Sequence, residues 1–245
     1  EIKESFTAKD TVLLHGITGS GKTELYIRLI DQVISQGKQV LYLLPEIALT
    51  SQIINRLRKY FGPKAGVYHS KYNEQERVEI WNRVLVGNLH QELEQYSVIL
   101  GARSALFLPF ENLGLIIIDE EHDTSYKQMD PAPRYNARDA AIMLARMHGA
   151  LTLLGSATPS VESYYNAREG KYALVELNQR YGGMMLPEVL CVNLKEAAKS
   201  KLMQSHFSSF LVDHIKLAID NKEQVILFQN RRGFSLRIEC DSCNW

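Results

Sequence analysis

The first part of the chain alternates short apolar runs with longer amphipathic segments. Residues 39–44 and 113–118 are nearly continuous apolar runs, which is typical of strands that a parallel sheet buries on both faces. Amphipathic segments of helical length separate such runs, and this alternation predicts an α/β fold in which helices flank a mostly parallel sheet. The expected strands are 11–15, 39–44, 65–69, 96–101, 113–118, 151–155 and 172–177, and the expected helices are 22–36, 47–61, 74–87, 136–148 and 159–169.

The pattern becomes irregular after the last of these strands. Residues 178–205 have no clear period and are expected to form a linker. Beyond them, a helix at about 206–221 and a strand at 224–228 are expected. The chain is therefore predicted to hold a first domain at residues 1–177 and the beginning of a second domain at 206–245.

The composition narrows the class of protein. Hydrophobic residues make up 45% of the 245 positions, which is ample for a core, and no apolar run approaches the roughly 20 residues that span a bilayer. The polar start at residues 1–5 indicates no signal peptide, and three cysteines in a chain of this length favour a reducing compartment. Lys+Arg and Asp+Glu each number 28, so nucleic-acid contacts must come from local patches. A soluble, cytoplasmic globular protein with no membrane partner is expected.

The most informative motif is Gly-Ile-Thr-Gly-Ser-Gly-Lys-Thr at 16–23, between the predicted strand 11–15 and the predicted helix 22–36. In this strand–loop–helix context the GxxxxGK[ST] pattern predicts phosphate binding. The glycines let main-chain N–H groups converge on an anion, the helix N-terminus adds partial positive charge, and Lys22 reaches the β- and γ-phosphates of a nucleotide. The expected nucleotide-binding residues are Gly16, Thr18, Gly19, Ser20, Gly21, Lys22 and Thr23.

A second motif, Asp-Glu-Glu-His at 119–122, follows directly on the apolar strand at 113–118. In P-loop enzymes, a hydroxyl of the phosphate loop and an acid at such a strand end share a Mg²⁺ ion. Thr23 and Asp119 are expected in these roles, and Glu120 is expected to orient or deprotonate the attacking water. The predicted catalytic residues are Lys22, Asp119 and Glu120.

A third motif, Gly-Ser-Ala-Thr-Pro at 155–159, follows the apolar run at 151–154. His122 is expected to couple the acidic strand end to this motif through Ser156 and Thr158, or only to tie the two together by a hydrogen bond. P-loop kinases and transporter ATPases are disfavoured, because they lack such an element after the acidic strand. The three motifs in this order predict a protein that binds and hydrolyses a nucleoside triphosphate.

The acidic motif and the residues after it, Asp-Thr-Ser-Tyr-Lys-Gln at 123–128, resemble the primosomal replication-restart helicases, the PriA-type proteins of helicase superfamily 2. Segments that match further motifs of this family are 45–50, 101–107, 155–163 and 229–234. The resemblance implies a P-loop NTPase fold, with 1–177 as a RecA-like helicase lobe 1 and 206–245 as the start of lobe 2. It implies an ATP- and Mg²⁺-dependent 3′→5′ DNA helicase motor that acts in primosome assembly and in the restart of stalled replication forks. The implied partners are single-stranded and forked DNA, single-strand binding protein and other primosome components.

The resemblance also implies a DNA-sensing loop at 126–135, which carries tyrosines, prolines and basic side chains. Aromatic rings stack on bases with about 1–3 kcal/mol per base, and basic side chains attract the backbone. Hydroxyl and guanidinium groups at strand ends suit phosphate oxygens. The alternative is an ordinary surface loop whose tyrosines pack back on the sheet. The expected DNA contacts are Thr50, Arg103, Ser104, Tyr126, Lys127, Arg134 and Tyr135.

Cys240 and Cys243 form a CxxC pair, which supplies half of the ligands of a tetrahedral zinc site. The resemblance implies that they belong to a cysteine-rich insertion of the second lobe, which binds two zinc ions in the full-length protein. The other cysteines of that insertion are missing here, so the chain alone is expected to hold no zinc. Cys191 has apolar neighbours and is expected in the core.

The resemblance further implies that an adenine-contacting glutamine precedes residue 1 and that the lobe 2 arginine follows residue 245. The chain is accordingly interpreted as lobe 1 with a lobe 2 truncated at the zinc-binding insertion, and alone it is expected to be nearly inactive. Two other functions stay open at this point. One is an ATP-gated nucleic-acid-binding platform with no essential unwinding. The other is a superfamily 2 RNA helicase, against which the acidic motif and the 123–128 match count.

Overall fold

The computed structural model describes the chain with the exception of residues 47, 49–50, 70–71, 86–94, 184–186 and 229–245. The chain forms two compact units, residues 1–185 and residues 186–245. The expectations for Thr50, Cys240 and Cys243 fall outside the described residues, as does the motif at 229–234.

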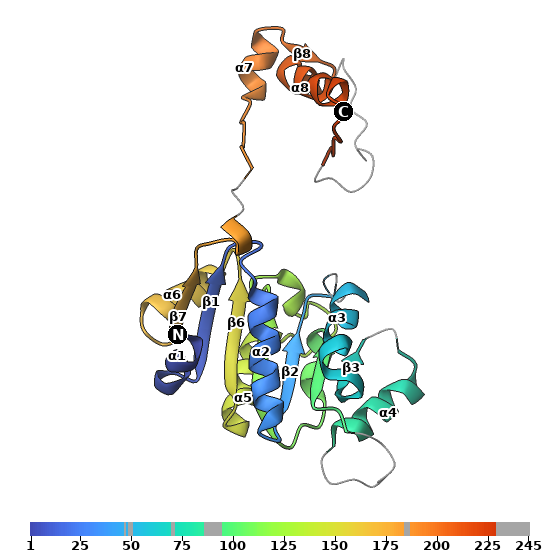
Figure 1. Ribbon diagram of the computed structural model, residues 1–245, viewed down its shortest axis with the longest axis vertical. Coiled ribbons are helices and arrows are strands. Elements are labelled where there is room, and N and C mark those ends of the chain that lie inside the picture. Colours follow the sequence, from blue (N-terminus) through green and yellow to red (C-terminus); the bar gives the residue numbers. More distant parts are fainter. Residues whose placement is uncertain (47, 49–50, 70–71, 86–94, 184–186, 229–245) are drawn as a thin grey trace. The chain divides into compact units, whose positions relative to one another are not determined.

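Unit 1 is built on a parallel sheet of seven strands with the order β3-β4-β2-β5-β6-β1-β7 (Figure 1). The strands are β1 (Thr11–Gly16), β2 (Gln39–Leu43), β3 (Ala65–Tyr68), β4 (Val98–Gly101), β5 (Leu113–Asp119), β6 (Leu151–Ser156) and β7 (Ala173–Leu177). Each predicted strand of this unit is present, and its ends differ from the prediction by at most two residues. The carboxyl ends of β1, β5 and β6 lie together, because Asp119 pairs with Gly155 and His15 pairs with Ser156.

Helices cover both faces of this sheet (Figure 1). The helices of unit 1 are α1 (Ile2–Ala8), α2 (Lys22–Ser35), α3 (Ser51–Phe61), α4 (Glu74–Val84), α5 (Ala137–His148) and α6 (Val161–Arg168). On one face, Tyr26 of α2 and Leu57 of α3 share a core with Val12 of β1. On the other face, Ala141 of α5 shares a core with Leu13. Burial of each large aliphatic side chain contributes about 1.5–3 kcal/mol, so both cores hold the strand ends in place.

The helices follow the prediction less closely than the strands. The sequence pattern predicts neither α1 nor the short 3₁₀ helices Gly62–Lys64, Arg103–Phe107, Thr124–Tyr126 and Tyr181–Gly183. Within the described residues, α3 begins at Ser51 and α4 ends at Val84. The start of α4 is fixed by a capping box, in which the Asn73 side chain and the Glu76 side chain each accept a hydrogen bond from the other's main-chain N–H.

The described part of unit 2 contains two helices and a short antiparallel hairpin. They are α7 (Leu194–Lys199), β8 (Met203–Gln204), β9 (Phe207–Ser208) and α8 (Ser209–Asp220). The predicted helix at 206–221 corresponds to α8, which begins where the Ser208 side chain accepts from the Leu211 N–H. Inside the segment expected to be an irregular linker, α7 is a regular helix, and the Asn193 side chain caps it.

Two expectations for unit 2 are wrong. Residues 223–228 form no strand, and Ile226 and Phe228 are 92% and 86% exposed. A strand needs a hydrogen-bonded neighbour, and no strand in the described ranges pairs with this segment. Cys191 is exposed, in the stretch without regular structure that precedes α7.

Unit 1 extends beyond the last strand of its sheet to residue 185. The segment after β7 stays attached to the loop after β1, because the Tyr181 N–H donates to the Gly19 carbonyl. The division into a lobe at 1–177, a linker at 178–205 and a second lobe from 206 stays a prediction. Among the helices in the described part of the chain, none is long and apolar enough to cross a membrane.

Candidate functional site

The phosphate loop, residues 16–23, joins the end of β1 to the start of α2. Gly19 and Gly21 have φ of +77° and +88°, a conformation that glycine adopts at no steric cost. A Cβ on Gly16 would lie 2.9 Å from Ser20 Oγ and would displace that side chain. These glycines therefore let the main chain turn tightly in front of the N-terminus of α2.

The donors of this loop fit the phosphates of a nucleotide. The Lys22 Nζ donates to the Gly16 carbonyl at 2.6 Å, so the ammonium lies over the loop itself. The buried Ser20 Oγ has no hydrogen-bond partner among the described residues, although buried hydroxyls are usually paired. Thr23 is half-buried at the second position of α2, and Thr18 is exposed in the loop. All seven residues expected to bind nucleotide thus lie at one helix N-terminus, where partial positive charge favours an anion.

Two tyrosines hold the carboxylate of Asp119 at the end of β5. The Tyr26 hydroxyl, from α2, donates to Oδ1 at 3.0 Å, and the Tyr42 hydroxyl, from β2, donates to Oδ2 at 3.2 Å. Both rings are fully buried. Gly155 makes room for this arrangement, because a Cβ there would overlap the Tyr26 hydroxyl and lie 2.9 Å from its Cζ. The sequence analysis missed both tyrosines, although a tyrosine inside the apolar run 39–44 was a signal.

The surroundings of Asp119 raise the pKa of its carboxyl group. Burial is the main cause and the Glu120 charge adds to it, whereas the hydrogen bond from Tyr26 and the charge of Lys22 lower the pKa. The pKa values of Tyr26 and Tyr42 lie well above the usual range, first through burial and then through the Asp119 charge, so both hydroxyls stay protonated. A buried carboxylate in this setting gains stability from a nearby cation, which fits the magnesium role expected of Asp119.

Glu120 is the opposite of Asp119 in exposure and in main-chain geometry. Its side chain is 39% exposed, and its φ is +48°, in the left-handed region that non-glycine residues rarely adopt. Such a conformation costs of order 1–3 kcal/mol and is found at functional sites. The Glu120 N–H donates to Asp119 Oδ1 at 3.2 Å, and the partly exposed Glu120 carboxylate lies 3.6 Å from His122 Nδ1.

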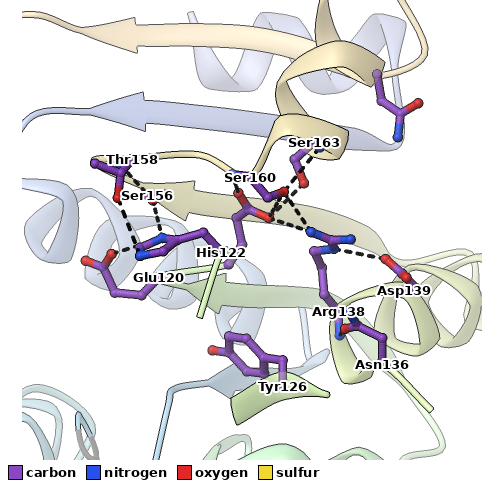
Figure 2. A network of polar contacts seen from close by, with 12 residues as sticks. Glu120, His122, Tyr126, Asn136, Arg138, Asp139, Ser156, Thr158, Ser160 and Ser163 are labelled. Atoms are coloured by element: carbon purple, nitrogen blue, oxygen red, sulfur yellow. Dashed lines mark hydrogen bonds and ion pairs between the residues drawn. The ribbon is translucent and has the colours of Figure 1, made fainter. Parts of the chain in front are cut away.

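His122 joins the acidic strand end to the segment after β6 (Figure 2). Its Nδ1 lies 2.7 Å from Ser156 Oγ, and its Nε2 lies 3.4 Å from Thr158 Oγ1. The Thr158 N–H donates to Ser156 Oγ at 2.9 Å, which closes the cluster. The predicted contact between these two motifs is therefore present, and its role in coupling stays a prediction.

Glu121, which the sequence analysis left without a role, is the centre of a second polar network. Its partners Arg138, Ser160 and Ser163 are labelled in Figure 2. Its buried carboxylate accepts from the Ser160 N–H at 2.7 Å, from Ser160 Oγ at 3.0 Å and from Ser163 Oγ at 2.7 Å. Arg138 of α5 donates to the same carboxylate at 3.2 Å and to Ser160 Oγ at 2.7 Å. The network fastens the acidic strand end to α5 and α6. Ser160, which caps α6, was the only feature of the sequence that indicated this network.

The expectation that Tyr126 stacks on DNA bases is wrong. Its side chain is 1% exposed, and its hydroxyl donates to the Asp119 main-chain carbonyl at 2.7 Å. For this residue the alternative interpretation holds, in which a tyrosine of the loop packs back on the sheet. The sequence could not show the difference, because a tyrosine suits either position.

Arg103 is tied to the loop after β5. Its Nη1 donates to the carbonyls of Ser125 and Lys127 at 3.3 and 3.1 Å. This arginine therefore links the 3₁₀ helix Arg103–Phe107 to the predicted DNA-sensing loop. A phosphate contact by its remaining donors stays a prediction, as does a contact by the half-buried Ser104.

The outer face of the predicted DNA-sensing loop presents charge and aromatic surface. Lys127 and Arg134 are exposed, and the Lys127 Nζ donates to the Arg134 carbonyl at 3.0 Å. A β-bridge between Lys127 and Asn136 closes the loop. The half-buried Tyr135 meets the ring of Phe107 edge-on at 5.2 Å, and Phe107 is 59% exposed. Phe107 is thus a candidate contact that the sequence analysis did not include.

Comparison with known protein families shows to which family the chain belongs. Residues 1–167 match the family of DEAD/DEAH box helicases. The chain belongs to the DEAD/DEAH box helicase family. This confirms the expected RecA-like α/β fold and places the chain in a family of helicases.

Individual relatives narrow the similarity within the family. The chain is 42% identical to replication restart protein PriA of Bacillus subtilis over 95% of its length, 41% identical to that of Chlamydia trachomatis over 100%, and 46% identical to that of Rickettsia felis over 94%. It spans 28%, 32% and 34% of these relatives. The resemblance to the PriA-type helicases is therefore confirmed.

A solved structure agrees with this fold. The crystal structure of DUF1998 helicase MrfA bound to DNA matches with a TM-score of 0.50 and 18% identity. The match covers 71% of this chain and 26% of that one. At this level of identity the likeness concerns the fold alone.

Proposed function

We propose that this chain is the nucleotide-binding motor lobe of an ATP-dependent DNA helicase that acts in primosome assembly and in the restart of stalled replication forks. The observation that carries the proposal is the common end of β1, β5 and β6, where the phosphate loop, the acidic motif and the segment 155–159 meet. The similarity to proteins named replication restart protein PriA supports the DNA substrate and the role at forks.

The proposed reaction is hydrolysis of ATP. The main-chain N–H groups of the phosphate loop and the Lys22 ammonium hold the triphosphate. Water attacks the γ-phosphorus, the bond to the β–γ bridging oxygen breaks, and ADP leaves with that oxygen. Glu120, which is open to solvent, accepts the proton of the water. Mg²⁺, held by Thr23 and Asp119, would neutralise charge on the phosphate oxygens.

The donor set fits magnesium within this lobe. No cluster of three histidine, cysteine, aspartate or glutamate side chains is present in the described residues. Magnesium sites of this kind use one or two protein oxygens, and water and phosphate oxygens complete the shell. Zinc is proposed only for the full-length protein, where Cys240 and Cys243 would need further ligands.

The proposed contact with single-stranded DNA is the outer face of the loop that Lys127 and Asn136 close. Lys127 and Arg134 offer charge to the backbone, and Tyr135 with Phe107 offers rings to bases. Beneath this face, Tyr126 connects the loop to Asp119 through one hydrogen bond. Further proposed phosphate contacts are Thr50, Arg103 and Ser104, and the proposed coupling residues are His122, Ser156 and Thr158.

Finer details of the function belong to the same proposal. They are the 3′→5′ direction, forked DNA as substrate, single-strand binding protein and other primosome components as partners, and a cytoplasmic location. The motif resemblance supports them, together with the identity of 41–46% to the PriA relatives. Each can be measured on the full-length protein that contains this chain.

The deciding experiment measures ATP hydrolysis and separation of a forked duplex by that protein. Lys22→Ala should abolish ATPase activity and unwinding, because it removes the charge on the phosphates, while DNA binding survives. Wild-type turnover in this variant would contradict the proposal. DNA binding that follows occupancy by a non-hydrolysable analogue, with no strand separation that needs hydrolysis, would favour an ATP-gated platform. Preference for RNA in a binding competition would favour an RNA helicase.

A further inference from the structure

The main chain that leaves the sheet after β7 runs back along the phosphate loop. The Ile17 N–H donates to the carbonyl of Leu177, the last residue of β7, at 3.1 Å. The Tyr181 N–H donates to the Gly19 carbonyl at 3.0 Å. Residues 177–181 are thus attached to the phosphate loop at two points. The side chain of Arg180, next to the second point, lies against the loop as a result.

Arg180 has an unusual environment for an arginine. Its Cγ and Cδ lie 3.9 Å from the position that a Cβ on Gly19 would take, so its stem packs on the tip of the loop. Its Nε is buried and has no hydrogen-bond partner in the described part of the chain. No carboxylate among the described residues forms an ion pair with it. A guanidinium is always charged, so this position leaves a desolvated donor beside an anion-binding loop.

Other partly buried arginines of unit 1 differ from Arg180 in this respect. Arg138 has Glu121 and Asp139 as charged partners, and Arg103 has two main-chain carbonyls. Buried donors in folded proteins are almost always paired, so an exception calls for an explanation. Packing alone does not supply one, since a leucine or methionine would cover Gly19 without burying a charge.

We propose that Arg180 is a nucleotide ligand, whose guanidinium binds the phosphate oxygens of the nucleotide held by residues 16–23. The inference rests on the proposed function of that loop. A planar guanidinium matches phosphate oxygens in pairs, which a lysine cannot do. The contact lies outside the GxxxxGK[ST] motif and adds a ligand from the segment that leads out of unit 1. Phosphate binding thereby involves a residue of the segment after β7, which the motif does not include.

The test compares the affinities of ATP and of inorganic tripolyphosphate for this chain and its variants by titration calorimetry. Arg180→Ala should weaken both ligands by about 10- to 100-fold, the loss expected for a hydrogen bond between charged groups. Arg180→Lys should recover part of the loss. The control is Arg168→Ala, since Arg168 is exposed at the end of α6. It should leave both affinities within about twofold.

Two results would overturn the inference and leave the proposed function intact. The first is wild-type affinity for both ligands in Arg180→Ala. The second is a loss for ATP with none for tripolyphosphate, which would mean that the arginine contacts the base or the ribose. If the wild-type chain bound neither ligand and Lys22→Ala changed nothing, the proposed function would fail as well. Urea unfolding of each variant distinguishes a lost contact from a lost fold.

Discussion

Asp119 and Glu120 are neighbours in the sequence, but their surroundings are opposite. Asp119 is held by hydroxyls from α2 and β2, whereas Glu120 is partly exposed and has a left-handed main-chain conformation. This contrast fits the proposed roles, in which Asp119 holds a cation and the more exposed Glu120 reaches water. The division of roles inferred from the motif therefore has a physical basis in burial and hydrogen bonding.

The first prediction separates binding from hydrolysis at this pair. Glu120→Gln should leave ATP affinity within a few fold, because Lys22, Thr23 and Asp119 remain, and should slow turnover by about 10²–10⁴-fold through loss of the general base. Steady-state ATPase assays and a nucleotide titration on the full-length protein measure both quantities. A collapse of ATP affinity with an unchanged maximal rate would show that Glu120 binds nucleotide instead.

At the residue scale, the sequence predicted the charged groups of the site better than their supports. The motif at 16–23 contains Lys22, and the motif at 119–122 contains Asp119 and Glu120. Their roles could therefore be proposed from the motifs without coordinates. Tyr26 and Tyr126 could not be assigned in this way. Which hydroxyl reaches Asp119 depends on how α2 packs on the sheet and on where the chain turns after β5.

At the scale of elements, α2 and β6 are packed so closely that only glycine fits at position 155. A second prediction follows from this contact. Gly155→Ala should lower the free energy of unfolding by about 1–3 kcal/mol, because the added methyl overlaps the Tyr26 hydroxyl. In a Tyr26→Phe background the same substitution should cost less, since the overlapping oxygen is gone. Urea unfolding of the four proteins measures the coupling.

The matched control for this comparison uses Tyr42, the other tyrosine that holds Asp119. Tyr42 also donates to Asp119, but none of its atoms is among the three nearest to a Cβ at 155. Gly155→Ala should therefore cost as much in a Tyr42→Phe background as in the wild type. Equal costs in both phenylalanine backgrounds would mean that the clash is relieved elsewhere, and the packing argument would be wrong.

The third prediction concerns the loop between Lys127 and Asn136. Combined Lys127→Ala, Arg134→Ala and Phe107→Ala should leave basal ATPase activity near normal, because none of these side chains touches the phosphate loop or Asp119. Stimulation by single-stranded DNA should fall, with DNA affinity at least about tenfold weaker, since stacking contributes about 1–3 kcal/mol per base. Met129→Ala, an exposed change in the same loop, is the control. Unchanged stimulation in the combined variant would exclude this face as the DNA contact.

The strands of unit 1 were predictable because a strand buried on both faces needs an unbroken apolar run. The same reasoning failed at 224–228, where the run is apolar but no strand of the described residues lies beside it. Short helices carry little signal in a hydrophobic pattern: α7 is set by the Asn193 cap, and α1, which has no side-chain cap, packs Ile2 and Phe6 against the core. Sequence patterns thus predicted the buried strands of the sheet and the longer amphipathic helices, and missed short elements such as α1 and α7.

At the scale of the whole molecule, the chain has about a third of the length of its PriA relatives. Fast hydrolysis in related motors needs an arginine delivered from outside the phosphate-binding lobe, which accounts for about 10³–10⁵ in rate. The resemblance assigns that arginine to a segment beyond these residues. The length of the relatives therefore bears directly on the activity of the chain alone.

The fourth prediction is that the isolated chain folds and binds ATP weakly, and hydrolyses it at least about 10³-fold more slowly than the full-length protein, with or without DNA. Its two terminal cysteines should hold no stoichiometric zinc. ATPase assays and metal analysis of the purified chain measure these properties, with the full-length protein as the reference. DNA-stimulated turnover near that of the full-length protein would show that the catalytic groups are all contained in residues 1–245.

The attachment of residues 177–181 to the phosphate loop has a mechanical consequence. Two hydrogen bonds, from Ile17 to Leu177 and from Tyr181 to Gly19, make the loop and the first residues after β7 a single stiff piece. A displacement of the loop as phosphate enters or leaves would be transmitted as tension to the chain behind residue 181.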